Sequence, residues 1–287
     1  MRAALLAALL AVVMLPAAAQ NQVGVAYYDA DRLYDTIPSP FYDDSAYTPS
    51  GRYSWTGERY MRKVRAVAAV LDSMAMPLAV LAGVENEQTV RDIAVACRSE
   101  YSYIHRTLPT RDGLDMALLY FGDAFVPESI EAGRRVLTVM GRLAGCRTVI
   151  VAGYDAAEIE QAVAGARSSH PGAAVIAAGR CSGAKLGRYG VRDAVAAEER
   201  AGRGTVVERG EWRFGARMWV DTMFDSRAGI YARRELLDEA GRAPAATFSG
   251  GKYRGGTGRE LPFFVYLRPK GTPFKPQSAE RGIGNGE

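Results

Sequence analysis

The sequence predicts a mixed-sheet α/β or α+β protein, because apolar runs of strand length alternate with amphipathic segments of helix length. The clearest strand signal is residues 77–86, PLAVLAGVEN, where a short apolar run begins at a proline and ends in a carboxylate and an amide. Such a run is typical of a buried central strand. A hairpin signal at Ala144-Gly145 occurs beside helix-length crossovers, and this mixture favours mixed sheets over a purely doubly wound parallel sheet.

The N-terminal half contains the clearest helix signal. A first strand is expected over residues 22–28, and three carboxylates follow it in residues 29–36, DADRLYDT. A helix should begin near Thr56, which is a capping residue type, and end before the 77–86 strand. Its apolar residues recur every three or four positions, so they share one face: Tyr60, Val64, Val67, Ala68, Leu71 and Met74.

The remaining elements follow from the same patterns. A second helix should begin near Asn86, with an inner face formed by Val90, Ile93, Ala94 and Cys97. Another helix is expected at 156–167 and some helix at 191–201. Strands are expected at these ranges: 101–105, 114–121, 135–143, 146–154, 173–178, 216–224 and 261–267.

Composition limits the classes of function. The chain has 287 residues, of which 48% are hydrophobic and 24% charged, as in an ordinary globular protein. Its two histidines, His105 and His170, leave little material for a zinc site or a histidine-based triad. His105 is expected at the surface or in a pocket wall. The formal charge of +4 is too small to indicate nucleic-acid binding by itself.

Residues 1–19 have the features of a secretory signal peptide. Arg2 supplies the positive charge, residues 3–15 are apolar, and Ala17-Ala18-Ala19 provides a cleavage pattern. The apolar run is short and broken by Pro16, which argues against an uncleaved membrane anchor, and no second run is long enough to span a membrane. We therefore expect a secreted or periplasmic protein.

The mature chain is expected to contain one domain over residues 20–268, because no linker divides it. A tail over 269–287 is rich in proline, glycine and charge, and is expected to be disordered. Cys97, Cys146 and Cys181 lack a C-x-x-C arrangement, so a redox role is not indicated. Two of them could pair in an exported protein, but burial as small apolar residues is the preferred interpretation.

Six stretches of the chain carry a family resemblance. In order they are YYDADRLYDT (27–36), YTPSGRYSWTGERYMRKV (47–64), VEN (84–86), DGLDMALLY (112–120), RGEW (209–212) and FSGGKYRGGTGRELPFFVYL (248–267). Together they resemble the secreted bacterial group of the endonuclease/exonuclease/phosphatase superfamily. Several motifs in one order are a specific signal, although each alone is weak.

This resemblance implies a fold and a chemistry. The fold is a four-layer sandwich of two packed mixed β-sheets flanked by helices. The chemistry is metal-assisted hydrolysis of phosphate esters, in which a carboxylate-held Mg²⁺ polarises the phosphate. An Asp/His pair and an Asp/Asn pair orient and activate water in that family, and a further histidine binds the phosphate.

The metal-binding motifs are altered in this sequence. Asp29 and Asp31 stand where the family has an asparagine and an acidic residue. The family's metal-binding glutamate corresponds to Gly83. The retained Glu85 corresponds to a second acid of the motif, on the same side of the strand but about 7 Å further on, so it does not simply substitute.

The other motifs are altered too. The family's phosphate-binding histidine corresponds to Gly153, and its Asp/Asn pair corresponds to Arg180 and Ser182. Its closing Asp/His pair corresponds to Arg259 and Glu260. Loss of a single oriented charge typically costs several kcal/mol of transition-state stabilisation. We therefore expect little of the family's mechanism to remain.

Two functional hypotheses follow. The first is an exported pseudoenzyme with a binding or structural role and no cofactor. In it, Arg180 and Arg259 either form salt bridges with Asp29, Asp31 or Glu260 or make a pocket for an anionic ligand. The second is a divergent Mg²⁺-dependent phosphodiesterase or nuclease, the only hypothesis that involves nucleic acid. Its rearranged metal site would use four carboxylates: Asp29, Asp31, Glu85 and Asp115.

The glycine-rich segment 250–259 is a weaker candidate for phosphate binding. Its backbone N–H groups could surround a phosphate. It lacks the G-K-[ST] ending of a P-loop, so a flexible loop before the last strand is the preferred interpretation.

Overall fold

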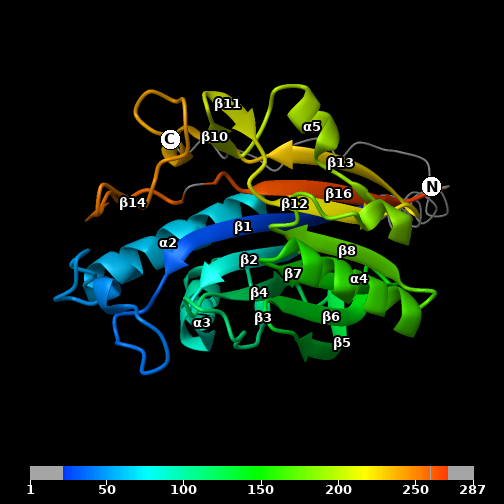
Figure 1. Ribbon diagram of the computed structural model, residues 1–287, viewed down its shortest axis with the longest axis horizontal. Coiled ribbons are helices and arrows are strands. Elements are labelled where there is room, and N and C mark those ends of the chain that lie inside the picture. Colours follow the sequence, from blue (N-terminus) through cyan, green and yellow to red (C-terminus); the bar gives the residue numbers. More distant parts are fainter. Residues whose placement is uncertain (1–21, 259, 271–287) are drawn as a thin grey trace, which may run out of the picture.

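Two six-stranded β-sheets pack face to face in the computed structural model, which describes residues 22–258 and 260–270 (Figure 1). The expected signal peptide, Arg259 and the tail from residue 271 onward lie outside the described residues.

The first sheet is mixed. Its strand order is β13 (Phe224–Ile230), β16 (Phe263–Pro269), β1 (Val23–Leu33), β2 (Leu78–Val84), β4 (Asp115–Tyr120) and β3 (Ser102–His105). β1 and β2 run parallel, and the other neighbouring pairs are antiparallel. Every residue of β2 is buried, as expected of a central strand.

The second sheet is also mixed. Its strand order is β5 (Phe125–Ala132), β6 (Val136–Leu143), β7 (Cys146–Gly153), β8 (Ala174–Gly179), β12 (Arg217–Asp221) and β9 (Val191–Asp193). β7 and β8 run parallel with Gly153 opposite Gly179. Ala144 and Gly145 both have positive φ, which is the geometry of the expected two-residue hairpin between β6 and β7.

Helices cover the outer faces of both sheets. α2 (Gly57–Met74) and α3 (Glu87–Ala96) pack on the first sheet, and α4 (Ala156–Ser169) packs on the second. The caps of the first two helices are the expected residues, because Thr56 and Asn86 accept hydrogen bonds from backbone N–H groups of the first turn. The mixed sheets and the four-layer sandwich are therefore confirmed.

Short elements complete the chain. They are α5 (Ala196–Arg200), β10 (Val206–Glu208), β11 (Glu211–Arg213), β14 (Phe248–Ser249), β15 (Lys252–Tyr253) and the 3₁₀ turns η2 (Ser45–Tyr47), η3 (Leu186–Tyr189) and η4 (Arg234–Leu236). None of the helices among the described residues is long and apolar enough to cross a membrane.

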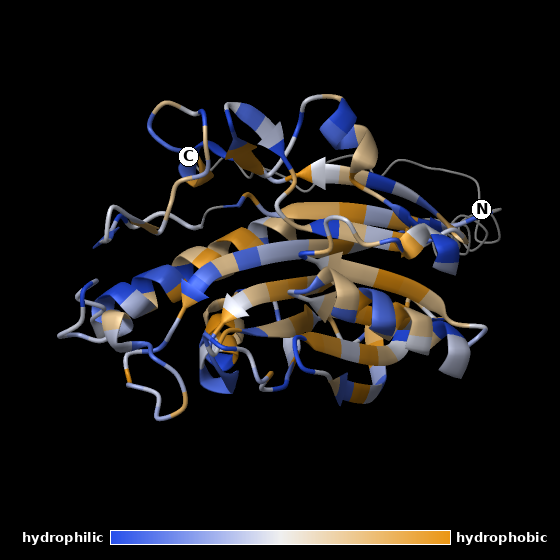
Figure 2. Cartoon of the chain, viewed as in Figure 1, coloured by the Kyte–Doolittle hydropathy of each residue, from blue (hydrophilic) through white to orange (hydrophobic). Residues whose placement is uncertain are grey.

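The largest apolar core lies between the two sheets, and a second lies between the first sheet and its helices. Hydrophobic residues are concentrated on the central strands of both sheets (Figure 2). Cys181 is buried in a third cluster beside α4, and Cys97 and Cys146 are half-buried. All three cysteines are unpaired, as expected of small apolar residues.

The helix expected within residues 191–201 is α5, which follows the short strand β9. Three other expectations about the elements were wrong. β1 continues to Leu33, so residues 29–33 belong to the strand. The 216–224 segment is divided between β12 and β13. β5 was missed because it is an edge strand with a proline, two glutamates and mostly exposed side chains, which hide the strand pattern.

The N-terminus of α4 generates a prediction about stability. The Asp155 side chain accepts hydrogen bonds from the backbone N–H groups of Ala157 and Glu158. Asp155→Ala should lower the free energy of unfolding by about 1 kcal/mol, because two N–H groups lose their acceptor. Urea denaturation followed by circular dichroism measures this change. Asp155→Asn is the matched control and should stay close to the wild type; an equal loss in both variants would contradict the capping role.

Candidate functional site

One end of the sandwich brings together four of the positions that the family resemblance aligns with functional residues. Asp29 lies on β1, Gly83 on β2, Gly153 at the end of β7, and Arg180 directly after β8. The backbone N–H of Arg180 donates to the Gly153 carbonyl over 3.0 Å, which continues the pairing of β7 with β8 past its last residues. The carboxyl ends of parallel-paired strands are where α/β proteins commonly place their binding sites.

The Tyr154 hydroxyl joins the two sheets at this end. It accepts a hydrogen bond from the backbone N–H of Gly83 and donates one to the backbone carbonyl of Asp115, both over 2.6 Å. Tyr154 follows β7 in the second sheet, whereas its two partners belong to β2 and β4 of the first sheet. Burial, together with the nearby Asp29 carboxylate, holds the pKa of this hydroxyl well above its usual range, so it stays a neutral donor.

β1 is distorted beside this contact. Asp31 and Arg32 have φ values of 48° and 57°, and the pairing of β1 with β2 changes register between Asp29 and Leu33. Consecutive non-glycine residues in the left-handed region are uncommon and need support from their surroundings. One support is the Asp29 carboxylate, whose Oδ1 accepts from the Asp31 N–H over 2.8 Å.

Lys63 provides the second support. This α2 side chain is buried, and its Nζ donates to the Asp31 carbonyl over 2.9 Å and to the Thr247 hydroxyl over 2.7 Å. Desolvation lowers the pKa of its ammonium group to about 7, against the attraction of Asp31 and Asp29. Lys63 therefore anchors the distorted part of β1 to α2 and to the segment that precedes β14.

Arg180 and Asp29 form an ion pair across the two sheets. Arg180 Nη2 lies 3.3 Å from Asp29 Oδ2, and the arginine side chain is 62% exposed whereas the aspartate side chain is 11% exposed. Of the three carboxylates considered as partners, Arg180 therefore contacts Asp29. Asp31 pairs instead with its neighbour Arg32, over 3.3 Å. Arg259, the other candidate for an anion pocket, lies outside the described residues.

The Asp29 carboxylate occupies the space beside Gly83. A Cβ added at Gly83 would lie 2.6 Å from Asp29 Oδ1 and 3.2 Å from the Asp31 nitrogen. Gly83 also has a φ of 74°, which disfavours any residue with a side chain. Position 83 therefore offers no side-chain oxygen to a metal, and the Asp29 carboxylate fills the space in which a side chain would begin.

Glu85 is directed away from Asp29. Its carboxylate accepts from the Asp35 N–H over 2.6 Å and from the Tyr42 hydroxyl over 2.9 Å. Burial raises its pKa to about 7. This carboxylate holds the loop between β1 and α2 against the end of β2.

Asp115 is also used internally. His105 Nε2 lies 2.9 Å from its Oδ2, and the Leu108 N–H donates to its Oδ1 over 2.8 Å. Both His105 and Asp115 are buried, so the expectation of a surface or pocket-wall position for His105 was wrong. The reason is that β3 pairs with β4 and brings the imidazole next to this carboxylate.

These residues do not fit a Mg²⁺ site. Magnesium needs several oxygen ligands directed at one point. Arg180 occupies the free oxygen of Asp29, Gly83 has no side chain, and Glu85 and Asp115 face other partners. No group of three His, Cys, Asp or Glu side chains suited to one metal ion occurs within residues 22–258 and 260–270. No catalytic step through a metal follows from this geometry.

The glycine-rich segment forms a hairpin rather than a phosphate loop. β14 pairs with β15, and Gly250 and Gly251 make the turn between them with φ values of 57° and 70°. A Cβ at Gly251 would lie 2.2 Å from the Arg52 guanidinium, so this turn packs closely against the loop before α2.

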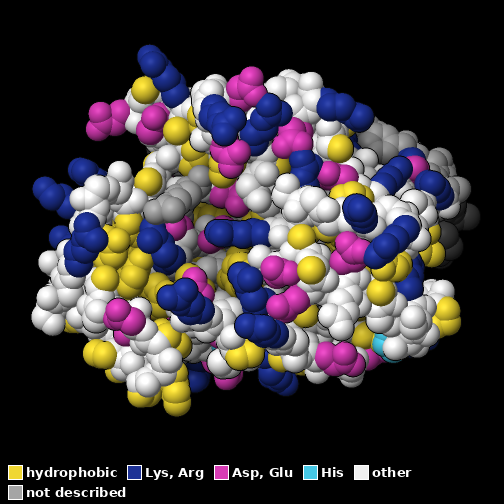
Figure 3. All heavy atoms as spheres, viewed as in Figure 1, with side chains coloured by type: hydrophobic (Ala, Val, Ile, Leu, Met, Phe, Trp, Pro, Cys, Tyr) yellow, Lys and Arg dark blue, Asp and Glu magenta, His cyan; other side chains and the backbone are white. Residues whose placement is uncertain are grey.

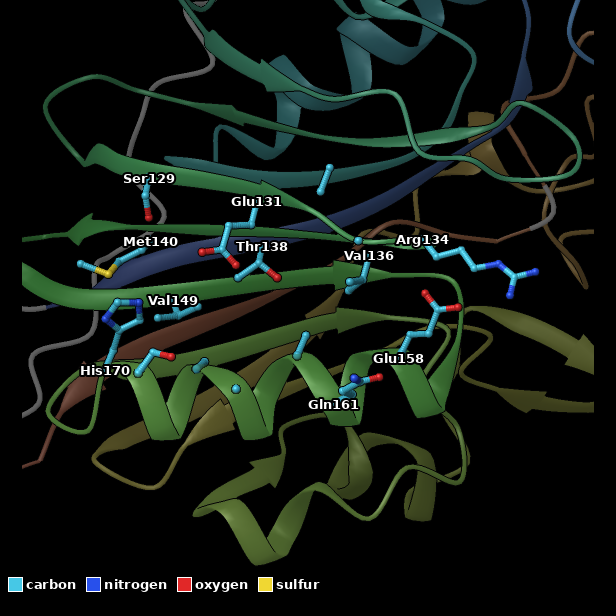
Figure 4. A pocket seen from close by; sticks show the side chains of 16 residues that line it. Ser129, Glu131, Arg134, Val136, Thr138, Met140, Val149, Glu158, Gln161 and His170 are labelled. Atoms are coloured by element: carbon cyan, nitrogen blue, oxygen red, sulfur yellow. The ribbon is translucent and has the colours of Figure 1, made fainter.

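A groove of about 540 Å³ lies elsewhere, on the outer face of the second sheet beside α4. Figure 4 shows Glu131 and Thr138 on its strand side and Glu158 and Gln161 on its helix side, with His170 at one end. Neither Asp29 nor Arg180 lines it. Charged side chains of both signs lie side by side across the face seen in Figure 3, so this face is not a uniformly basic surface for nucleic acid.

Comparison with known proteins agrees with the architecture. A sequence model described as the Endonuclease/Exonuclease/phosphatase family matches residues 24–211, more than half of the chain. This protein therefore belongs to the endonuclease/exonuclease/phosphatase family. A search of curated protein sequences found no match.

Solved structures share the fold at low sequence identity. An endonuclease/exonuclease/phosphatase family protein from Bacteroides thetaiotaomicron is 13% identical, with a TM-score of 0.57, and the alignment covers 86% of this chain and 97% of that one. D. rerio TDP2, humanized by 14 mutations, is 12% identical, with a TM-score of 0.56 and coverages of 86% and 99%. Bacteroides thetaiotaomicron mannosyl-6-phosphatase is 12% identical, with a TM-score of 0.53 and coverages of 85% and 99%.

Sequence reasoning missed two polar side chains that organise this end of the sandwich, Tyr154 and Lys63. Tyr154 directly follows Gly153, which the family resemblance aligns with a histidine, and this alignment was the only signal for it. Lys63 lies three residues after Tyr60 and four before Val67, on the apolar face of the predicted helix, which is an unusual place for a charge.

The geometry at Gly83 predicts the effect of adding one methyl group. Gly83→Ala should lower the free energy of unfolding by about 2 kcal/mol or more, because the Cβ meets the Asp29 carboxylate and the backbone is left-handed. Gly165→Ala is the control, since Gly165 lies within α4 with open space around it; it should stabilise by about 0.5–1 kcal/mol. Urea denaturation compares the two. A neutral Gly83→Ala would contradict the close packing of Asp29.

The His105–Asp115 contact predicts a structural role for Asp115. Asp115→Ala should destabilise by about 2–4 kcal/mol, because a buried imidazole and a backbone N–H lose their acceptor. Asp123→Ala is the control, because Asp123 is exposed in the turn after β4, and should change stability by less than about 0.5 kcal/mol. Thermal or urea unfolding measures both. A stable Asp115→Ala protein would instead make this carboxylate available for function.

Proposed function

We propose that this protein is an exported, catalytically inactive member of its family that binds an anionic ligand at Arg180. The ion pair between Arg180 and Asp29 beside Gly83 carries the proposal. It places a fixed positive charge where the family resemblance implies a metal held by carboxylates. Expected export depends on the signal-peptide pattern of residues 1–19.

The exposure of Arg180 supports binding rather than a purely internal role. Its side chain is 62% exposed, and only Nη2 contacts Asp29. Nε and Nη1 make no hydrogen bond to any other described residue, so they remain available to an oxyanion from solvent. A guanidinium is suited to this task because its planar N–H groups can bind two oxygens of one carboxylate or phosphate.

The alternative is a divergent Mg²⁺-dependent phosphodiesterase or nuclease. One observation favours it: Asp29 and Asp31 lie next to each other on the distorted part of β1, and Asp31 Oδ2 is buried without a hydrogen-bond partner among the described residues. Such an enzyme would need Arg180 to leave Asp29 before a metal could bind.

Metal titration separates the two proposals. We expect calorimetry of the purified protein with Mg²⁺ and with Mn²⁺ to show no saturable binding. Bis-p-nitrophenyl phosphate and plasmid DNA should be hydrolysed no faster than in buffer. A loss of several oriented charges leaves little transition-state stabilisation, which is the reason for this expectation.

The contrary outcome is also specific. Metal-dependent turnover that is abolished in Asp31→Ala but kept in Asp123→Ala would overturn the proposal and make this protein a divergent hydrolase. Turnover that stays at the wild-type rate in both Asp29→Ala and Asp31→Ala would indicate a contaminating enzyme and would leave the proposal standing.

A further inference from the structure

Glu260 is a buried carboxyl group at the same end of the sandwich, and no role has yet been assigned to it. It is 8% exposed and lies just before β16. Its Oε1 accepts from the Thr205 hydroxyl and from the Ala216 N–H, each over 2.7 Å. Its Oε2 has no hydrogen-bond partner among the described residues. A Cβ at Gly215 would lie 3.1 Å from the carboxyl group, so the backbone packs directly against it.

The groups that face Glu260 come from three elements. Asp29 and Tyr27 belong to β1, Arg180 follows β8, and Thr205 and Ala216 lie in the segments on either side of the β10–β11 hairpin. The Tyr27 hydroxyl is fully buried without a partner among the described residues, and it lies within the electrostatic influence of Asp29, Glu260 and Arg180. The positive charge of Arg180 lowers the pKa of Glu260, and Asp29 already pairs with this guanidinium.

The charge count depends on the protonation state of Glu260. With this carboxyl neutral, Asp29 and Arg180 balance each other. With Glu260 ionised, the three described side chains Asp29, Arg180 and Glu260 together carry one net negative charge in a poorly solvated place, which opposes the approach of an anion. A bound anion and an ionised Glu260 would both need the positive charge of the Arg180 guanidinium to compensate their own negative charge.

We infer that Arg180 binds a small monoanionic oxyanion together with one proton, which Glu260 takes up from solvent. This inference rests on the proposed function and adds a ligand class and a form of regulation to it. The ligand class is a carboxylate or a singly charged phosphate or sulfate ester. The protonated carboxyl keeps its Oε1 contacts, and no covalent bond of the ligand forms or breaks.

The direction of the pH dependence follows from burial. Desolvation, with a further contribution from Asp29, raises the pKa of Glu260 from its usual value to about 7. Below pH 7 the carboxyl is protonated before the ligand arrives, so binding is independent of pH. Above pH 7 a proton must be taken up on binding, and affinity falls by up to tenfold per pH unit.

Two other groups titrate near pH 7 and must be distinguished. Glu85, whose pKa is also about 7, faces the loop with Tyr42 and Asp35. Lys63, with a pKa of about 7, contacts the Asp31 carbonyl from the α2 side of β1. Glu260→Gln isolates the inferred group, because glutamine retains an oxygen for Thr205 and Ala216 but cannot ionise. Glu85→Gln is the matched control.

The experiment is calorimetric titration of the purified protein with p-nitrophenyl sulfate and, separately, with benzoate, from pH about 6 to about 8.5. Both probes keep a single negative charge across this range, so any pH dependence belongs to the protein. One probe is a tetrahedral oxyanion and the other a carboxylate, which separates the two ligand sources. The wild-type dissociation constant should rise by up to about 30-fold from the lowest to the highest pH.

The variants decide the assignment. Glu260→Gln should bind with nearly the same affinity at every pH, Glu85→Gln should follow the wild type, and Arg180→Met should lose binding. Unchanged pH dependence in Glu260→Gln would overturn the inference and direct attention to Lys63. If the wild type binds equally tightly at all pH values, the inferred proton uptake by Glu260 is overturned, although the proposed anion site at Arg180 is not. Absence of binding at every pH would overturn the anion site itself.

Discussion

The Tyr154 hydroxyl is the contact on which the geometry of this end of the sandwich depends. Tyr154 directly follows β7 of the second sheet, and its hydroxyl makes two hydrogen bonds of 2.6 Å to the backbone of Gly83 and Asp115 in the first sheet. Arg180 enters from the second sheet and Asp29 from the first, so their ion pair requires the two sheets to keep one relative position. Apolar packing between sheets is not directional, whereas two hydrogen bonds from one oxygen fix both distance and orientation.

Buried charge at this end is compensated locally and in pairs. Asp29 is paired with Arg180, and Asp31 is paired with Arg32. Lys63 donates to the backbone carbonyl of Asp31, and Asp115 contacts His105. Glu85 and Glu260 are the exceptions, because each carboxyl is held by a hydroxyl and a backbone N–H rather than by a cation. Neutral hydrogen-bond donors compensate an ionised carboxylate only partly, and burial therefore has the largest effect on the pKa of both groups.

Local patterns predicted most of the fold. The apolar period of residues 57–74, the caps Thr56 and Asn86 and the run at 77–86 each depend on neighbours in sequence, and each was placed within a few residues. The family resemblance supplied the sandwich, which no local pattern could. The sequence did not predict the edge strand β5, or the division of residues 216–224 between β12 in one sheet and β13 in the other. Exposure of an edge strand and the sheet that a segment joins are both determined by tertiary neighbours.

The site was less predictable than the fold for the same reason. The sequence indicated that Gly83, Gly153, Arg180 and Glu260 replace functional residues of the family. It did not indicate that Arg180 would contact Asp29 or that Lys63 would donate to the Asp31 carbonyl. It also did not indicate that Glu85 and Asp115 would each be held by other partners. Those partners lie between 7 and 151 positions apart in the chain. Which of several nearby carboxylates a side chain contacts depends on distances in the folded protein, and residue spacing in the sequence does not give those distances.

The filled space at Gly83 has a consequence for anyone who would build a metal site at this end of the sandwich. A glutamate introduced there would place its Cβ against the Asp29 carboxylate and put a side chain on a left-handed backbone. This single substitution would therefore harm folding before it could supply a metal ligand. Asp29 would have to be replaced by a smaller residue first, and Arg180 would then lose its partner. Positions 29, 83 and 180 therefore depend on one another, and they would have to be redesigned together.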